Sequence, residues 1–376
     1  MSAQVILQPS RDKSLRRKHP WVFESAVAEL KGRARIGDTV DVFDDEGDWL
    51  GRGAYSPHSK IRVRMWTFKK DESIDNGFFL RRLETALALR KRLFDPNKTN
   101  AFRWIASESE ILGLEVAGVV SEVASDVSTF KEGDRVCGLV AGGGYATEAL
   151  VNPAHLMRIP QGMPFFEAAG LTEVFLTAFQ CLRTIAHIKP AQRALIHGGA
   201  SGVGLAATQL CRYWGVHSAV TASSQEKLSL CEKNGAEQLI NYKQQAFDEV
   251  LKKAWPEGVD MVLDMVGGDY LNRNLQVLKR DGSVVYLAML AGRYADNLDM
   301  AMLLGKRASI IGTTLRNRSD EYKANLIGEF ATACIPAFES KELTVNIDTH
   351  YSIKDIDKPH GRLENNDTQG KLVVSW

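Results

Sequence analysis

From residue 194 onward, short apolar runs alternate with longer segments whose apolar residues recur at the helical period. This pattern predicts strands and helices in succession. They are strand 194–197, helix 203–214, strand 217–222, helix 225–234, strand 260–264, helix 270–278 and strand 283–287. Such a succession is typical of a parallel sheet covered by helices. The sequence therefore predicts an α/β fold for this region.

The region ahead of residue 194 has a different pattern. Apolar and polar residues alternate in three short segments near the beginning of the chain, and a hairpin turn at residues 44–47 separates the first two. The predicted strands are 37–43, 49–55 and 61–66, and a helix is predicted over 77–94. Glycine turns then separate further short segments, which we expect to form strands of a small barrel. These are 113–120, 133–138 and 142–147, followed by a mostly apolar predicted helix over 168–188.

The most informative segment is residues 194–204, ALIHGGASGVG, in which an apolar run passes through a glycine-rich turn into a helix. Glycines let backbone N–H groups approach a pyrophosphate, and the new helix directs its positive end at it. The next apolar run arrives at the spacing of a βαβ unit, which supports a dinucleotide site. The expected contact residues are Ala200, Ser201, Gly202, Val203 and Gly204. A purely structural turn in another doubly wound fold is the alternative.

Composition narrows the class of protein. A chain of 376 residues suggests two or three domains, and 44% apolar with 25% charged residues is ordinary for a soluble globular protein. The five cysteines are scattered, which argues against a structural zinc site and against a disulfide framework. We see no signal-peptide layout and no apolar run long enough to span a bilayer. We therefore expect a cytoplasmic protein that neither binds a metal nor enters a membrane.

Charge is unevenly spread along the chain. Residues 1–106 carry 21 Lys and Arg against 14 Asp and Glu, whereas the remainder carries 26 against 32. Such asymmetry suggests two parts with different partners, and an ordinary solvated surface is the alternative.

Several motifs in family order cover residues from about 109 to 376. They are 111–120 ILGLEVAGVV, 130–136 FKEGDRV, 175–179 FLTAF, 197–204 HGGASGVG, 264–268 DMVGG, 314–318 TLRNR and 370–374 GKLVV. In these motifs the chain resembles the zinc-free quinone oxidoreductases of the medium-chain dehydrogenase/reductase family, and the bacterial relatives of p53-inducible quinone oxidoreductase in particular. The resemblance implies a Rossmann dinucleotide-binding domain and a β-rich GroES-like catalytic domain.

A second, unrelated resemblance covers residues 1 to about 107. The motifs are 18–23 KHPWVF, 51–56 GRGAYS, 62–66 RVRMW, 78–83 FFLRRL and 102–106 FRWIA. They are similar to the start of ribosomal RNA cytosine-5 methyltransferases that begin with a PUA domain. The S-adenosylmethionine-binding half of that family has no counterpart here, so we expect no RNA methylation.

The two resemblances meet abruptly near residues 107–111. The oxidoreductase family normally carries further residues ahead of this point, which supply an Asn and a Tyr to the nicotinamide and quinone site, and no matching segment precedes it here. We therefore expect a fusion with a truncated GroES-like domain. The expected domains are PUA-like 1–72, helix and linker 73–108, partial GroES-like 109–165 with 315–376, and Rossmann 166–314.

The end of the second strand of the βαβ unit indicates which cofactor is preferred. NAD-selective sites place a carboxylate there, but this position offers Ser223 and Lys227, while Glu226 should already lie on the following helix. Tyr242 matches the family tyrosine that packs beside the 2′-phosphate. These donors favour a phosphate dianion, so we expect NADPH rather than NADH. A solvated helix lysine is the alternative for Lys227.

The resemblance supplies further candidate residues. Thr177 matches the family threonine at the nicotinamide amide, although a threonine satisfied by its own helix backbone is the alternative. Gly267 and Leu290 are expected to flank the cofactor, with ordinary turn chemistry as the alternative. Lys371 is expected either to reach the pyrophosphate or to be a surface lysine.

Near the beginning of the chain, three basic residues precede an aromatic residue. Arg16, Arg17 and Lys18 come shortly before Trp21, a combination that suits contact with the backbone and bases of structured RNA. A charged surface with Trp21 in the core is the alternative.

These observations favour an NADPH-dependent, zinc-independent quinone oxidoreductase that transfers hydride to a quinone or enone and is slowed by the missing segment. Two other interpretations stay open. One is an RNA-binding PUA protein with an inactive NADPH-binding part, and the other is a poorly stable chimera with exposed sheet edges. Relatives dimerise through strands after Ser283, and the apolar run 287–304 suits a homodimer interface.

Overall fold

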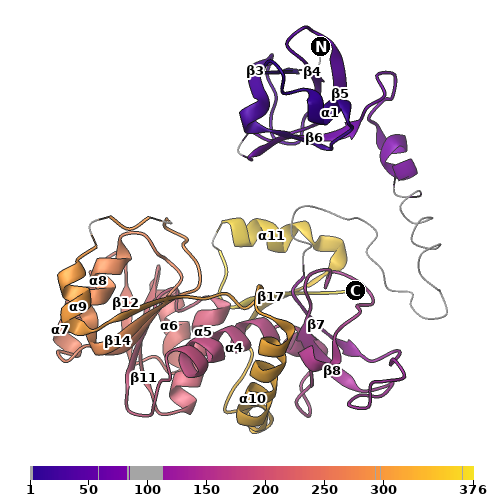
Figure 1. The fold of residues 1–376 in the computed structure, drawn as a ribbon. Coiled ribbons are helices and arrows are strands. Elements are labelled where there is room, and N and C mark those ends of the chain that lie inside the picture. Colours follow the sequence, from indigo (N-terminus) through magenta and orange to yellow (C-terminus); the bar gives the residue numbers. More distant parts are fainter. Residues whose placement is uncertain are drawn as a thin grey trace. The chain divides into compact units, whose positions relative to one another are not determined.

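The computed structural model describes residues 3–57, 59–82, 84, 113–292, 294–296, 298–365 and 367–376. The chain divides into two compact units, residues 1–106 and residues 107–376, which are described separately (Figure 1). The predicted helix 77–94 is described up to residue 82 and at residue 84. The predicted junction at 107–111 and the motif at 102–106 lie outside the described residues.

The first unit is a six-stranded sheet in the order β2-β6-β5-β4-β1-β3. The strands are β1 (Gln4–Leu7), β2 (Trp21–Phe23), β3 (Val27–Lys31), β4 (Thr39–Phe43), β5 (Trp49–Tyr55) and β6 (Ile61–Thr67), with the short helix α1 (Lys13–Arg16) after β1. β4 and β5 form the predicted antiparallel hairpin, and β6 confirms the third predicted strand. Val5, Val40 and Val63, on three of these strands, are completely buried in one apolar core.

The second unit is built on a six-stranded sheet in the order β12-β11-β10-β13-β14-β15, in which every neighbouring pair is parallel. The strands are β10 (Arg193–Ile196), β11 (His217–Ala222), β12 (Gln238–Asn241), β13 (Val259–Asp264), β14 (Leu278–Tyr286) and β15 (Ser309–Gly312). This arrangement confirms the predicted α/β fold. The strand that becomes β11 was predicted with its exact limits, whereas β12 and β15 were not predicted.

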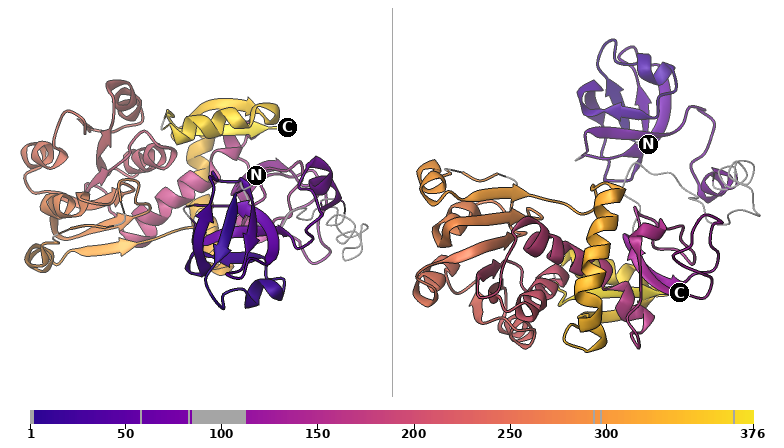
Figure 2. Two further views of the ribbon diagram at one scale, coloured as in Figure 1. Left: turned by 90° about the horizontal axis from the view of Figure 1, so that it is seen from above. Right: turned by 60° about the horizontal axis from the view of Figure 1, so that its bottom comes forward.

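Helices cover both faces of this sheet (Figure 2). One apolar core includes residues of α5 (Gly202–Tyr213) and α6 (Gln225–Lys233), and the other includes residues of α7 (Phe247–Ala254) and α8 (Tyr270–Val277). The short helix α9 (Met300–Lys306) packs beside the second core. The sheet is therefore the central layer of three.

One prediction ahead of this sheet is confirmed in part and another is wrong. The helix expected over 168–188 forms as α3 (Phe165–Ala169), α4 (Thr172–Phe179) and a π-helical turn (Gln180–Ile185), divided because Gly170, a poor helix former, ends the first helix. The strand expected over 142–147 does not form. Gly142 and Gly143 have φ of 132° and 83°, which are not extended conformations, and Gly144 N–H donates to Gly113 O at 2.9 Å.

The remaining strands of the second unit form two small sheets, and two 3-10 turns, Pro153–His155 and Ile353–Asp355, and two α-helices accompany them. The antiparallel sheet β7-β8-β9 comprises Glu115–Val119, Arg135–Leu139 and Leu156–Arg158, and β16 (Ile347–Ser352) pairs in parallel with β17 (Lys371–Ser375). The helices are α10 (Asp320–Glu339) and α11 (Asp357–Glu364). A single bridge between Ser201 and Gly370 ties the start of β17 to the glycine-rich turn. Over the described residues, no helix is long and apolar enough to cross a membrane.

Candidate functional site

A cleft of about 340 Å³ opens where β10, β11 and β13 end. After β10 the chain moves to β11 and β12 on one side, and it later returns to β13 on the other side, so the strand order reverses here. In open α/β sheets this switch point is where ligands bind. The lining residues are Gly198, Ala200, Ser201, Thr221, Ala222, Ser223, Lys227, Tyr242, Met265, Val266, Tyr270, Leu290, Ala291 and Thr368.

The glycine-rich turn brings the start of α5 to this cleft. A Cβ atom on Gly204 would lie 2.4 Å from Gly198 O and 2.6 Å from Gly199 O, so only glycine permits this approach of helix to strand end. Ser201 precedes the helix and its hydroxyl oxygen accepts from Gly204 N–H at 3.0 Å. The helix presents its positive end and its first backbone N–H groups at the cleft, which suits an anion such as a pyrophosphate.

A buried hydrogen-bond network beneath the turn fixes the strand ends. Asn274 Nδ2 donates to Asp264 Oδ2 (2.7 Å), which turns the amide oxygen of Asn274 toward His197 Nε2 (2.8 Å). Nε2 must therefore carry the proton, and Nδ1 accepts from the Thr221 hydroxyl (3.0 Å). Complete burial lowers the pKa of His197, and the opposing effects of Asp264 and Asn274 do not offset it. The network joins β10, β11 and β13 to α8.

The cleft brings together the three residues expected at a 2′-phosphate. Ser223, Lys227 and Tyr242 all line the cleft, Ser223 directly after β11 and Lys227 in the first turn of α6. Glu226 lies on α6 as predicted, and its carboxylate accepts from Gln369 Nε2 at 2.8 Å. The structure thus brings together the predicted phosphate donors, with no carboxylate at the position directly after β11.

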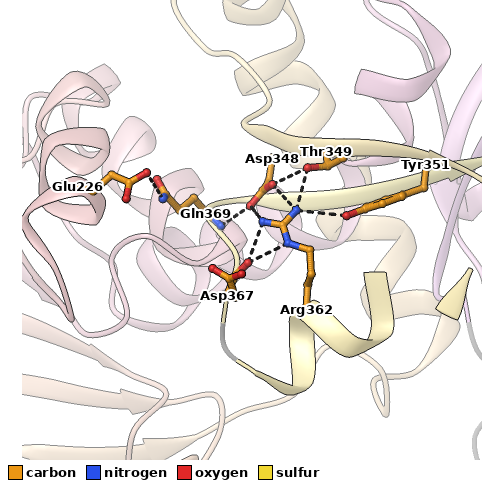
Figure 3. A network of polar contacts seen from close by, with 7 residues as sticks. All are labelled: Glu226, Asp348, Thr349, Tyr351, Arg362, Asp367 and Gln369. Carbon is orange, nitrogen blue, oxygen red and sulfur yellow. Dashed lines mark hydrogen bonds and ion pairs between the residues drawn. The ribbon is translucent and has the colours of Figure 1, made fainter. Parts of the chain in front are cut away.

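A charged network holds the segment that borders this side of the cleft (Figure 3). Arg362 of α11 binds both carboxylate oxygens of Asp348 at 2.8 and 3.0 Å, and it also donates to the carbonyl of Asp367. Asp348 in turn accepts from Gln369 N–H at 2.7 Å. Burial acts to raise the pKa of Asp348, but these hydrogen bonds outweigh it and hold the pKa below its usual value. Residues 367–371 are thereby fixed beside the glycine-rich turn.

The residues expected at the nicotinamide end are more dispersed. Thr177 is buried in α4. Gly267 has φ of 71° and forms a bridge with Gly292, and Leu290 lines the cleft with 80% of its surface exposed. Lys371 does not line the cleft. Its ammonium pairs with Glu115 of β7, and its side chain is only 22% exposed, so the alternative of a surface lysine is wrong.

Sequence reasoning missed part of the lining. Met265, Val266 and Tyr270 follow β13, and their place directly after a predicted strand at the switch point was a signal that could have found them. Thr368 comes from a segment without a recognisable motif. It lies between Asp367 and Gln369, which the network around Arg362 holds beside the cleft. Within the described ranges, no three His, Cys, Asp or Glu side chains are grouped so that they could hold a metal ion.

In the first unit, the residues expected to contact RNA differ in their surroundings. The guanidinium of Arg16 binds the carboxylates of Asp12 and Asp44, the latter at 2.6 Å, so it is engaged within the unit. Arg17 and Lys18 are exposed. Trp21 is half-buried on the edge strand β2 and lies outside the apolar core, so the alternative that places Trp21 in the core is wrong.

Aromatic rings continue along this edge. Trp21 meets His19 and Phe23 edge to face, at ring-centre distances of 5.6 and 6.1 Å, and Phe23 is 44% exposed. Exposed aromatic rings beside basic side chains are what stacking on nucleic-acid bases requires.

Comparisons with known proteins agree with this division. Residues 202–332 match the family model for zinc-binding dehydrogenases, residues 96–161 match the GroES-like domain of alcohol dehydrogenases, and residues 5–68 match a PUA-like domain. Over residues 113–376 the chain therefore combines a Rossmann domain with a GroES-like domain, preceded by a PUA-like domain.

Several solved structures are similar to the second unit. An Escherichia coli quinone oxidoreductase complexed with NADPH is 30% identical, with a TM-score of 0.62 over 70% of this chain and 81% of that chain. A quinone oxidoreductase from Pseudomonas syringae pv. tomato is 29% identical over the same shares, with a TM-score of 0.63. A mycobacterial protein complexed with NADPH is 26% identical, with a TM-score of 0.63 over 72% and 83% of the two chains.

The fold and cleft define a nicotinamide-binding oxidoreductase. The chain belongs, through its second unit, to the medium-chain dehydrogenase/reductase family.

The first unit has other relatives. The chain is 99% identical over 110 residues to the ribosomal RNA large subunit methyltransferase I of Alteromonas mediterranea, and 50% identical over 110 residues to that of Escherichia coli. In both cases the match spans 28% of the methyltransferase, so the chain shares less than a third of those proteins.

The buried network makes folding stability depend on pH. In the unfolded chain His197 takes up a proton as the pH falls below about 6.5, whereas the folded protein resists this because the pKa of His197 is lowered. The unfolded state then binds more protons, so stability falls with decreasing pH. We expect His197→Gln to reduce the loss of unfolding free energy between pH 7.5 and 5.5 by about 1 kcal/mol.

Urea unfolding at the two pH values measures this effect. His350→Gln, which changes an exposed histidine, is the control and should keep the wild-type pH dependence. An unchanged pH dependence in His197→Gln would show that the imidazole is not held neutral.

Proposed function

We propose that the second unit binds NADPH and transfers its hydride to a quinone or enone without a metal ion. The observation that carries this proposal is the cleft at the switch point, which a helix N-terminus and three phosphate donors border. Relatives whose structures are described as quinone oxidoreductases support the reaction class.

Preference for NADPH follows from the chemistry of the adenosine end. Ser223, Lys227 and Tyr242 offer two hydroxyls and an ammonium where the 2′-phosphate would lie. Charge-assisted hydrogen bonds to a phosphate are strong, and a carboxylate at that position would repel it. The nearby carboxylate of Glu226 is held by Gln369 instead.

When bound, NADPH supplies the hydride, and the protein contributes position and exclusion of water. Ala200 to Gly204 would hold the pyrophosphate at the start of α5. Gly267 and Leu290 would border the nicotinamide end, with Thr177 of α4 toward its amide. Lys371 would reach the pyrophosphate only by leaving Glu115.

We also propose that turnover is slow. In the part of the chain that the structure describes, the GroES-like sheet has three strands, and the match to the GroES-like family model begins at residue 96. We infer that the family stretch with the Asn and Tyr of the quinone site has no counterpart ahead of it. Hydride transfer needs donor and acceptor in near contact, and misplacement by about 1 Å can cost about a hundredfold in rate.

A second candidate function belongs to the first unit. We propose that it contacts structured RNA through Arg17, Lys18 and Trp21, because these basic side chains are exposed next to an aromatic edge strand. The likeness to PUA-containing ribosomal RNA methyltransferases supports this. If the dehydrogenase part proves inactive, RNA binding becomes the main function.

A homodimer through the edge of the Rossmann sheet is proposed as well. β15 is the edge strand, and Ile310 on it is 38% exposed. Met300 and Leu304 of α9 are 62% and 79% exposed. Pairing of two edge strands would cover these apolar side chains.

The NADPH site is tested by Lys227→Ala. Loss of the ammonium should weaken NADPH binding by about 1–3 kcal/mol, the range for hydrogen bonds to charged groups, and hardly affect NADH. Fluorescence titration of both cofactors measures this, with Lys233→Ala, an exposed lysine at the other end of α6, as the control. Equal losses for the two cofactors would refute the assignment.

The proposed reaction is tested by NADPH oxidation with 1,2-naphthoquinone in the presence of a chelator. We expect slow, quinone-dependent oxidation that Lys227→Ala impairs through KM for NADPH. Oxidation that stops on chelation would contradict a metal-free mechanism.

RNA binding is tested by its salt dependence. If the first unit binds ribosomal RNA hairpins, Arg17→Ala combined with Lys18→Ala should reduce the slope of log K against log salt by about 2, because two phosphates of the RNA would no longer be neutralised by the protein. Arg16→Ala is the control, because its guanidinium is engaged with Asp12 and Asp44. Absence of binding at low salt would leave this unit without an RNA role.

The homodimer is tested by light scattering. We expect a mass twice that of one chain, and Ile310→Asp should halve it by placing a charge on the paired edge. A wild-type mass of one chain would contradict the dimer.

A further inference from the structure

A carboxyl group that the proposed cofactor contacts do not use lies at the start of α4. Glu173 is one helical turn before Thr177, so both residues lie on the same face of this helix. Thr177 is the residue proposed to meet the nicotinamide amide. The same face of α4 therefore carries a titratable group one turn from Thr177.

The surroundings of Glu173 link it to the glycine-rich turn. Its backbone N–H donates to Glu115 Oε2 at 2.8 Å, and Glu115 pairs with the ammonium of Lys371. The stem of Lys371 and the side chain of Val174 both pack at the start of α5, since a Cβ on Gly202 would lie 3.1 Å from Lys371 Cδ and 2.9 Å from Val174 Cγ1. The cluster thus adjoins the beginning of the proposed pyrophosphate site.

Within the described residues, the carboxyl of Glu173 takes part in no ion pair, unlike that of Glu115. Burial raises the pKa of Glu173 to about 7, and the charge of Glu115 on β7 adds to this effect. The cations that face it act in the opposite direction without outweighing burial. They are Lys371 on β17, Lys323 on α10 and Arg316 after β15. Glu173 can therefore carry or release a proton near neutral pH, which suits a general acid.

We propose that Glu173 is the proton donor for the reduced quinone, a role that rests on the proposed function. Hydride transfer from NADPH moves two electrons and one hydrogen to the quinone and leaves an oxyanion. The O–H bond of Glu173 breaks, its proton forms the second O–H bond of the hydroquinone, and the carboxylate is reprotonated from solvent. The sum is NADPH, quinone and one proton giving NADP⁺ and hydroquinone.

The first test compares pH profiles. Wild-type kcat/KM for the quinone should fall as the pH rises above about 7, because Glu173 loses its proton. Glu173→Gln should lower kcat/KM about a hundredfold at pH 6, the scale of general acid catalysis, and should remove this decline. Glu173→Asp should retain the decline, and Glu132→Gln, an exposed glutamate ahead of β8, should behave as wild type.

The second test needs no turnover. A carboxylate at this position attracts the positively charged nicotinamide ring of NADP⁺ but not the neutral ring of NADPH. The ratio of Kd for NADPH to Kd for NADP⁺ should rise about tenfold in wild type between pH 6 and 8, and it should stay constant in Glu173→Gln. Thermal unfolding of each variant confirms that it is folded.

The outcomes separate the two claims. If Glu173→Gln keeps the wild-type pH profile and ratio while the quinone is reduced, the inference is overturned and the proposed function stands. If wild type reduces no quinone, the proposed function and the proton transfer both fail. A pH-dependent ratio that only Glu173→Gln abolishes would still place the carboxyl beside the nicotinamide.

Discussion

The close approach of α5 to the end of β10 is the constraint on which the cleft depends. Gly204 allows it, since any Cβ there would collide with the carbonyl oxygens of Gly198 and Gly199. The approach places the positive end of a helix at the point where the strand order reverses. The neutral imidazole of His197 holds the strand ends from below through Thr221 and Asn274. Backbone geometry and a buried network thus shape the cleft that we propose as the anion site, and Ser223, Lys227 and Tyr242 line it.

Several carboxylates hold polar and charged side chains in place. Beside the residues proposed to hold the 2′-phosphate, the carboxylate of Glu226 accepts a hydrogen bond from Gln369. Lys371 is paired with Glu115, and the carboxyl of Glu173 lies next to this pair with a raised pKa. In the first unit, the carboxylates of Asp12 and Asp44 bind the guanidinium of Arg16, whereas Arg17 and Lys18 are exposed.

Sequence reasoning located the strands whose limits are set by local patterns. The apolar run over 217–222 becomes β11, and the glycine-rich turn becomes the start of α5, because helix entry and strand burial follow short-range rules. It failed at residues 142–147, where Gly142 and Gly143 adopt positive φ, and at Gly170, a poor helix former that divides the expected helix. The pairing of Lys371 with Glu115 joins residues far apart in the chain, so no local pattern could reveal it. The same holds for Thr368, which Arg362 and Asp348 bring to the cleft.

The central claim is that this cleft is an NADPH site, and the most direct measurement is the affinity of the unmodified chain for NADPH and for NADH under identical conditions. Isothermal titration gives both dissociation constants and the stoichiometry. The account predicts one NADPH per chain, bound at least tenfold more tightly than NADH, since a single charge-assisted contact to the 2′-phosphate contributes about 1.5 kcal/mol or more. Equal affinity for both cofactors, or tighter binding of NADH, would contradict it.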